Sequence, residues 1–193
     1  MPRSREERAE LSEGIVGEGR RLSRLVENLL DMSRIEAGKA EPHREPIDLR
    51  EVLDAARGGL ADPESVHLSA DSELPMVDAD AAQLERAFAN LLENAVRYSD
   101  GEPVSVTSSS LGARVAVSVA DRGPGIHRDE RERIFEPFQH GDSGPAGDGA
   151  GLGLAIARGF VEANGGEISV DSRPGRGATF LVTLPERQGA GSS

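Results

Sequence analysis

The sequence predicts an α+β two-layer sandwich, in which a mixed sheet carries three helices on one face and a long N-terminal helix precedes it. Short apolar strands alternate with longer helical patterns through the last three quarters of the chain. Apolar residues recur at heptad spacing through the first 38 residues. The 193 residues, 37% of them hydrophobic, are enough to bury an ordinary core.

The first segment, 1–38, is predicted to be helical from residue 4 onward. Its a and d positions hold Leu11, Ile15, Leu22, Leu25, Leu29 and Met32. Gly38 is expected to end the helix, and a polar linker follows at 39–46. The apolar stripe is too hydrophobic to face water alone. We therefore expect a weak, concentration-dependent homodimer through residues 20–35.

The second segment, 47–186, holds the remaining elements, and a disordered tail is expected at 187–193. Apolar alternation predicts strands at 47–49, 66–70, 76–79, 104–109, 113–120, 167–171 and 178–184. Helical patterns cover 49–60, 80–98, 128–135 and 151–164. Asp80 and Gln83 have the spacing of a capping box, and Leu111-Gly112 is the expected turn of the first hairpin.

Composition excludes several classes of function. The absence of cysteine excludes disulfides, zinc–thiolate sites and cysteine nucleophiles. A net charge of −12 repels phosphate backbones, so we expect no nucleic-acid partner. No apolar run approaches the ~18 residues that a membrane span needs, and the N-terminus lacks the apolar region of a secretory signal.

The helix predicted at 80–98 carries a polar stripe that could bind a metal–phosphate group. The stripe consists of residues spaced i, i+3, i+4 and i+7, namely Asn90, Glu93, Asn94 and Arg97. Mg²⁺ takes oxygen ligands and retains several waters, so one amide oxygen can suffice. From this segment alone, a merely solvated helix face is the simpler interpretation.

Two glycine-containing segments could approach a ligand closely. In the first, Asp121 ends an apolar strand and is followed by Gly123, Gly125 and Ile126. A buried carboxylate there would need hydrogen-bond donors, and an adenine amino group is one such donor. The alternative is an ordinary glycine turn with an exposed aspartate.

The second glycine-rich segment, 147–154, runs directly into a predicted helix. Its glycines expose backbone N–H groups at the positive helix end, which favours an anion. No lysine follows, so it is not a P-loop, and no strand precedes it as in a Rossmann fingerprint. Between the two glycine segments, Phe135 and Phe138 are expected to pack in the core.

Taken in chain order, four segments resemble the N, G1, F and G2 boxes of the catalytic and ATP-binding domain of sensor histidine kinases, which has the Bergerat (GHKL) fold. They are the polar stripe of the 80–98 helix, the segment that begins at Asp121, the segment with Phe135 and Phe138, and the glycine-rich segment 147–154. The resemblance covers about 46–186. The phrase SRLVENLLDMSRIEAG is similar to the second helix of the dimerisation and phosphoacceptor region. LLDMSRIEAG and AIARGFVEANGG look most like the KdpD branch of the family.

This resemblance implies ATP and Mg²⁺ as ligands and assigns roles to individual residues. Asn94 corresponds to the Mg²⁺ ligand, with Asn90 and Glu93 assisting, and Glu93, Asn94 and Arg97 form the catalytic set. Tyr98 lies near the adenine and Asp121 accepts from its amino group. Phe135 and Phe138 anchor a lid at 139–150. The nucleotide-contacting set is Asn90, Asn94, Arg97, Tyr98, Asp121, Gly123, Gly125, Ile126, Phe138, Gly149, Gly151, Leu152 and Gly153.

The sequence departs from the family pattern in two respects. None of its four histidines, His43, His67, His127 and His140, lies in an H-E/D-x-x-x-P context. We therefore expect the chain to be a fragment that lacks the phosphoacceptor and cannot phosphorylate itself. In addition, no lysine or arginine occurs between Arg133 and Arg158, so weak or mobile lid closure is expected.

The implied function is transfer of the ATP γ-phosphoryl group to a histidine outside this chain, which then passes it to a response regulator. The implied location is the cytoplasmic end of a membrane-anchored parent kinase. Three alternatives remain. They are a stand-alone serine kinase of the anti-sigma type, a non-enzymatic ATP-dependent dimerisation module and, more distantly, a gyrase- or MutL-type ATPase.

Overall fold

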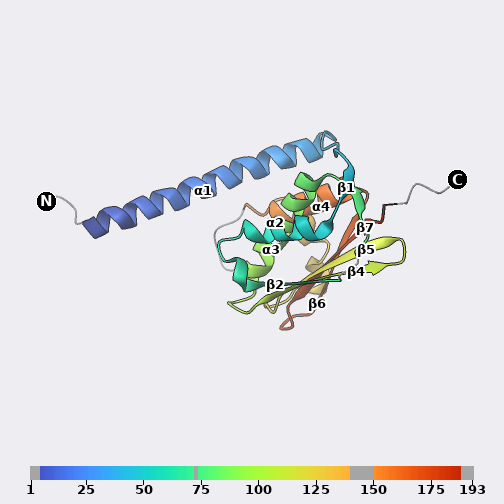
Figure 1. Ribbon diagram of the computed structural model, residues 1–193. Helices are drawn as coiled ribbons and strands as arrows, with labels where there is room; N and C mark the ends of the chain where they lie inside the picture. The colour runs from blue at the N-terminus through green and yellow to red at the C-terminus, as the bar shows by residue number, and fades with distance from the viewer. Residues whose placement is uncertain (1–4, 72–73, 140–149, 188–193) are drawn as a thin grey trace.

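The computed structural model describes residues 5–71, 74–139 and 150–187, and for residues 5–17, 20, 21 and 70 it describes only the backbone. Its main body is a five-stranded sheet with three helices on one face, and a long helix crosses above those helices (Figure 1). This arrangement confirms the predicted sandwich. The expected tail lies outside the described residues from 188 onward.

Helices and strands follow each other in the order that the sequence predicts. The helices are α1 (Arg5–Glu36), α2 (Leu49–Gly58), α3 (Ala81–Tyr98) and α4 (Gly153–Ala163). The strands are β1 (Glu45–Ile47), β2 (Val66–Ala70), β3 (Val77–Ala79), β4 (Val104–Leu111), β5 (Arg114–Ala120), β6 (Glu167–Ser172) and β7 (Ala178–Pro185). Three short 3₁₀ turns complete the set, at η1 (Pro63–Ser65), η2 (Arg128–Glu130) and η3 (Arg133–Phe135).

The main sheet has the strand order β2-β4-β5-β7-β6. Strands β4, β5, β7 and β6 pair antiparallel, whereas β2 pairs parallel to β4 with Val66 opposite Val104. The sheet is therefore mixed, as predicted. Strands β1 and β3 do not join it but form a separate two-stranded sheet.

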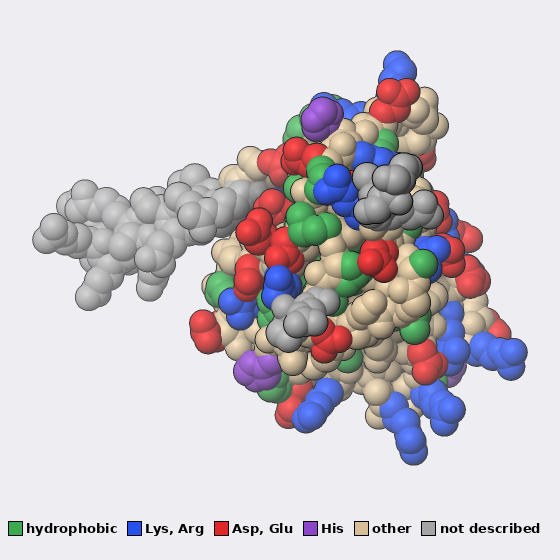
Figure 2. Space-filling view, turned by 45° about the vertical axis from the view of Figure 1, so that its right-hand side comes forward, with side chains coloured by type: hydrophobic (Ala, Val, Ile, Leu, Met, Phe, Trp, Pro, Cys, Tyr) green, Lys and Arg blue, Asp and Glu red, His purple; other side chains and the backbone are tan. Residues whose placement is uncertain are grey.

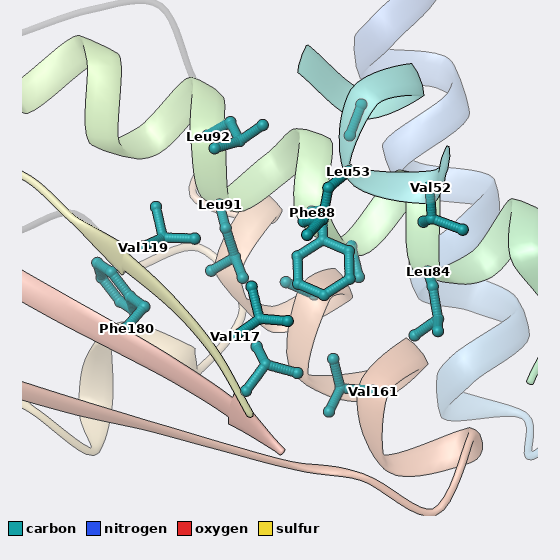
Figure 3. Packing of buried hydrophobic residues seen from close by; sticks show 14 of the residues in the cluster. Val52, Leu53, Leu84, Phe88, Leu91, Leu92, Val117, Val119, Val161 and Phe180 are labelled. Atoms are coloured by element: carbon teal, nitrogen blue, oxygen red, sulfur yellow. The ribbon is translucent and has the colours of Figure 1, made fainter. Parts of the chain in front are cut away.

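The core lies between this sheet and the helices α2, α3 and α4. Leu84, Phe88 and Leu91 of α3 are fully buried and face the sheet, and Leu53 of α2 and Val161 of α4 flank them (Figure 3). On the sheet side, the labelled residues are Val117, Val119 and Phe180. The apolar face of α3 therefore forms the centre of the core.

Three predicted boundaries were wrong. The first strand ends at Ile47 instead of continuing to 49, because Asp48 caps α2 by accepting a hydrogen bond from the Arg50 backbone N–H. The first hairpin turns at Gly112 and Ala113, since Leu111 still pairs with Arg114. Arg187, which was expected to belong to the tail, is held on the body, because its N–H donates to the Met76 carbonyl at 2.8 Å.

The predicted helix at 128–135 is replaced by two separate 3₁₀ turns, η2 and η3. Pro137 restricts the preceding residue to an extended conformation, and Glu136 indeed has φ −78° and ψ 145°. Phe135 is buried with its ring edge-on to Phe180, at 6.2 Å between ring centroids. The extended conformation of Glu136 ends the helical backbone, and the segment before it forms only the two short turns.

The predicted capping box is only half formed. Asp80 accepts from the Gln83 N–H at 3.1 Å, as expected. The return bond comes from a different residue, because the Asp80 N–H donates to the side chain of Asn164 at 2.8 Å. Asn164 is fully buried and also donates to Gln83 Oε1 at 3.0 Å. This amide therefore joins the end of α4 to the start of α3.

Helix α1 confirms the predicted N-terminal helix, and Gly38 follows its end with φ 64°. Its end lies against the body, where Ile35 packs on Gly159 of α4. The linker is held as well, because Arg44 donates to the Ala163 carbonyl at 2.9 Å. In the part of the chain that the structure describes, we find no helix with the length and hydropathy needed to cross a membrane.

Charge is spread over the body. Figure 2 shows acidic and basic side chains interspersed over the face that it presents, in a chain of net charge −12.

Candidate functional site

Helix α3 forms the floor along which the predicted site segments meet. Toward the middle of the helix, Asn90 packs against Gly153 at the start of α4. At the C-terminal end of the helix, the Tyr98 carbonyl lies against Gly123. Eight residues separate Asn90 from Tyr98, which corresponds to ~12 Å along the axis. The structure therefore brings three predicted segments together along α3: the polar stripe, the segment that follows Asp121 and the start of α4.

Asn90 provides a buried polar group without a protein partner. Its side chain is 8% exposed, and its Nδ2 has no hydrogen-bond partner among the described residues. The start of α4 lies directly beside this amide, because a Cβ at Gly153 would be in van der Waals contact with Asn90 Oδ1 at 3.4 Å. A buried donor without an acceptor is costly, and a ligand oxygen would satisfy it.

The first turn of α4 faces the same region. Its N-cap residue is Leu152, whose side chain cannot accept a hydrogen bond, and no other side chain among the described residues caps the helix. Free N–H groups and the positive end of the helix dipole favour an anion at this position. Together with Asn90, this helix start is chemically suited to phosphate oxygens.

Asp121 lies at the other end of the site and is 9% exposed. Its Oδ1 accepts from two backbone N–H groups, those of Gly123 at 2.8 Å and Ala178 at 3.1 Å. Both bonds go to the same oxygen, which leaves Oδ2 available to a ligand. Burial raises the pKa of Asp121 above its ordinary value of 3.8, and the two backbone hydrogen bonds partly oppose this shift. A ligand N–H at Oδ2 would stabilise the ionised carboxylate.

The glycines that follow Asp121 serve the protein's own packing. A Cβ at Gly123 would lie 2.4 Å from the Tyr98 carbonyl oxygen. A Cβ at Gly125, which has φ 74°, would lie 2.1 Å from the Arg173 carbonyl oxygen. The sequence interpretation attributed these glycines to ligand approach, whereas the visible reason is contact between neighbouring backbone segments.

The two phenylalanines behave differently. Phe135 is 4% exposed, contacts Phe180 and lies below the Arg158 guanidinium at 5.7 Å from the ring centroid. Phe138 is 62% exposed and has φ 62°, which is unusual for a residue with a side chain. The expectation that both pack in the core is therefore wrong for Phe138. Its N–H donates to the Gly151 carbonyl at 2.9 Å.

The other residues of the polar stripe are more exposed than Asn90. Asn94 is half-buried and Arg97 is exposed. Tyr98, which follows the stripe, is half-buried. Glu93 is also half-buried, and its carboxylate pairs with Arg24 of α1 at 3.7 Å. The stripe thus extends from a buried amide toward the long helix.

The remaining predicted residues lie around the start of α4 and in the segment that follows Asp121. Leu152 is buried, and Gly151 has φ 67°. Ile126 is half-buried beside the core. Gly149 and most of the expected lid at 139–150 lie outside the described residues. Within the described part of the chain, no group of three or more His, Asp or Glu side chains could hold a metal ion.

Sequence reasoning missed residues of the β6–β7 hairpin that support this site. The Ala178 N–H bonds Asp121, and the buried Ser172 hydroxyl accepts from the Ile126 N–H at 2.8 Å. The available signal was the Gly175-Arg-Gly177 turn, because closely spaced glycines indicate a backbone approach that other residues prevent.

Residues 79–188 match the family described as "Histidine kinase-, DNA gyrase B-, and HSP90-like ATPase". The chain is 41% identical over 165 residues to the sensor protein KdpD of Rathayibacter rathayi, covering 85% of this chain and 19% of that protein. It therefore spans about a fifth of the length of that relative.

Two solved structures are similar in fold and sequence. Full-length ShkA in complex with AMPPNP superposes with a TM-score of 0.80 at 31% identity, covering 99% of this chain and 41% of that one. The mycobacterial sensor histidine kinase MprB gives a TM-score of 0.67 at 30% identity, covering 75% of this chain and 100% of that one.

Proposed function

Because this chain belongs to the histidine kinase-, DNA gyrase B- and HSP90-like ATPase family, we propose that it is the ATP-binding catalytic portion of a two-component sensor histidine kinase. It transfers the γ-phosphoryl group of ATP to a histidine on a separate helix, and a response regulator then receives the group. The parent kinase is anchored in a membrane with this portion in the cytoplasm. The assignment to a sensor kinase is supported by the similarity to the sensor protein KdpD and to the sensor histidine kinase MprB.

One observation supports the proposal: a buried carboxylate, Asp121, and the start of α4 lie at two different positions along α3, near Tyr98 and near Asn90. Asp121 Oδ2 is the acceptor for the adenine amino group. The uncapped start of α4 and the Asn90 amide receive phosphate oxygens. The similarity to a structure that holds AMPPNP supports the same choice of ligand.

The polar stripe of α3 would hold the metal–phosphate group. Asn94, with Asn90 and Glu93, would ligate Mg²⁺ directly or through water, because amide and carboxylate oxygens suit this ion. Bound Mg²⁺ would neutralise charge that develops on the transferred group. Arg97 would contact the phosphates, and Tyr98 would line the adenine end. The acceptor histidine comes from a helix that packs beside α1, and a second copy of this chain pairs with α1 as a weak homodimer.

The test is a titration with fluorescent ADP and ATP analogues, with and without Mg²⁺. Asp121→Asn keeps the shape of the side chain but removes its charge, and we expect affinity to fall about 10- to 100-fold. Asn94→Ala should retain metal-free binding and lose the Mg²⁺ enhancement. The matched control is Asp129→Asn, an exposed aspartate on η2, which should bind like the wild type. Unchanged affinity in Asp121→Asn would overturn the adenine assignment.

The transfer step is tested with γ-labelled ATP and a separate fragment that carries a phosphoacceptor-histidine helix. We expect an acid-labile, alkali-stable label on that fragment, and no such label on this chain alone. An acid-stable label on serine of an added acceptor would favour the anti-sigma type of kinase instead. Binding without transfer to any acceptor would favour the ATP-dependent dimerisation module.

A further inference from the structure

Two loops from distant parts of the sequence interlock beside Asp121. The first is the adenine loop, residues 121–126, and the second is the hairpin turn, residues 172–178. The Gly177 N–H donates to the Gly123 carbonyl at 3.0 Å, and the Gly175 N–H donates to the Pro124 carbonyl at 2.6 Å. The conformation of the adenine loop therefore depends on the hairpin turn.

Ser172 connects these loops through its side chain. The residue is the last of β6 and is 4% exposed. Its hydroxyl accepts from the Ile126 N–H at 2.8 Å and donates to the Gly177 carbonyl at 2.6 Å. Its own carbonyl accepts from the Arg131 guanidinium. One buried residue thus holds the end of the adenine loop, the turn opposite it and the segment that follows.

The packing leaves little freedom for the loops to move separately. Gly177 has φ 71°, and a Cβ there would lie 2.1 Å from the Asp121 carbonyl oxygen. Gly125 approaches the Arg173 carbonyl equally closely. The backbones are already in contact, so a small displacement of the hairpin turn would move the Asp121 carboxylate as well.

We propose that Ser172 is a positioning residue of the nucleotide site, whose hydroxyl holds the adenine loop so that Asp121 Oδ2 faces the base. This inference rests on the proposed function, because it concerns recognition of the adenine amino group. Ser172 acts through the loop and does not touch the nucleotide. The hydrogen bonds of its hydroxyl and carbonyl go to the adenine loop, the hairpin turn and Arg131, so we expect it to affect base recognition and not the metal–phosphate end.

The hydroxyl is chemically suited to this task because it donates and accepts at the same time. Without it, the Ile126 N–H and the Gly177 carbonyl both lose a partner in a buried environment. Unpaired buried groups are costly, so the adenine loop would relax toward water or other partners. Asp121 would keep its charge but lose its fixed direction toward the ligand.

The experiment compares Ser172→Ala with Ser172→Thr, which retains a hydroxyl. The affinities of the full chain for ADP and inosine diphosphate, which lacks the amino group, are measured with and without Mg²⁺. For Ser172→Ala we expect ADP affinity to fall about tenfold, preference for ADP over inosine diphosphate to fall with it, and the Mg²⁺ enhancement to persist. Ser172→Thr should restore most of the ADP preference.

The matched control is Ser108→Ala, which removes another hydroxyl that is 4% exposed but has no hydrogen-bond partner among the described residues. It should leave both nucleotide affinities unchanged. In an Asp121→Asn background, Ser172→Ala should cause little further loss, because the group that it positions is already altered. If Ser172→Ala fails to fold, Ser172→Cys keeps the volume and weakens both hydrogen bonds.

The outcomes separate this inference from the proposed function. If the wild type does not bind ADP, the proposed function fails and this inference fails with it. If the wild type binds and Ser172→Ala loses stability but retains the full preference for ADP, the proposed function stands. Ser172 is then only a structural residue, and the positioning role is overturned.

Discussion

Helices α1 and α3 are both long and amphipathic, yet their apolar faces have different surroundings. On α3, Leu84, Phe88 and Leu91 are all 0% exposed beneath the sheet. On α1, Leu22 and Leu29 are 55% and 52% exposed. The comparison shows that apolar spacing determines whether a helix forms, whereas its cover depends on which other elements the chain supplies. α3 receives cover from this chain, whereas along its described part α1 receives little.

Contacts between α1 and the rest of the molecule are mainly polar. Arg86 of α3 donates to Asp31 at 3.2 Å and to Asn28 at 3.0 Å, and it pairs with Glu27 at 3.2 Å. Apolar contacts are confined to the last turns of the described helix, where Met32 and Ile35 pack against the core and Ile35 lies on Gly159. Polar contacts that are partly exposed are weak compared with a buried apolar face, so α1 is held loosely relative to α3.

The largest expected difference is in stability. Phe88→Ala in α3 should lower the free energy of unfolding by about 3–5 kcal/mol, because a fully buried ring is replaced by a cavity. Leu29→Ala in α1 should change it by less than about 0.5 kcal/mol. Urea unfolding followed by circular dichroism measures both. Equal losses in the two variants would mean that the α1 face is covered in solution as well as the α3 face.

The second difference is in self-association. The double change Leu22→Asp and Leu29→Asp should weaken a dimer through α1 by about 3 kcal/mol, or roughly a hundredfold. ADP affinity should be unchanged. Sedimentation measures the association, and Leu111→Asp, on an exposed leucine of β4, is the control. A dimer that persists would place the contact elsewhere, and lost ADP binding would show that α1 supports the nucleotide site.

The smallest expected effect concerns how firmly α1 is held. Arg86→Gln should remove about 1 kcal/mol or less of α1 docking, because the guanidinium is partly exposed. The chain has no cysteine, so spin labels can be placed on Gly19→Cys and Ser169→Cys, both exposed, to measure the distance between α1 and β6. We expect a broader distance distribution in Arg86→Gln, and in the wild type at 1 M salt.

The control for this measurement is Arg122→Gln, which breaks a pair with Glu102 on the body and away from α1. It should leave the distribution unchanged. A narrow distribution that survives both Arg86→Gln and high salt would show that the Ile35 contact is sufficient to dock the helix.

Much of the fold could be predicted because local signals agreed with the tertiary structure. Helix α3 follows its apolar period and its Asp80 cap, and the β6–β7 hairpin follows its glycine turn. The misassigned parts depend on distant residues. Asn164 completes the cap at Asp80 from 84 residues away, and no local pattern specifies that partner. Likewise, β1 and β3 are apolar enough to join the main sheet, but they pair with each other.

The candidate site was predictable to the extent that its residues form compact motifs. Asn90, Asp121 and Gly153 lie in such motifs, and the structure arranges all three around α3. Phe138 was misassigned because an aromatic residue normally indicates burial, whereas here it has a positive φ and its N–H bonds the distant Gly151 carbonyl. Ser172 was missed because a single serine at a strand end carries no periodic signal.

The contact of Ile35 with Gly159 holds α1 near its C-terminal end, so a small rotation there displaces the rest of the helix by a larger distance. A Cβ at residue 159 would lie 2.7 Å from a carbon of Ile35, so α1 and α4 are in close contact near the C-terminal end of the 32-residue α1. Rotation by about 10° around that point would move Arg24 by about 3 Å and the far end at Arg5 by about 8 Å, given ~1.5 Å of rise per residue. The shorter displacement is already enough to separate Arg24 from Glu93. A small rotation of α1 about Ile35 would thus move its N-terminal end by several ångströms and break the ion pair beside the polar stripe of α3.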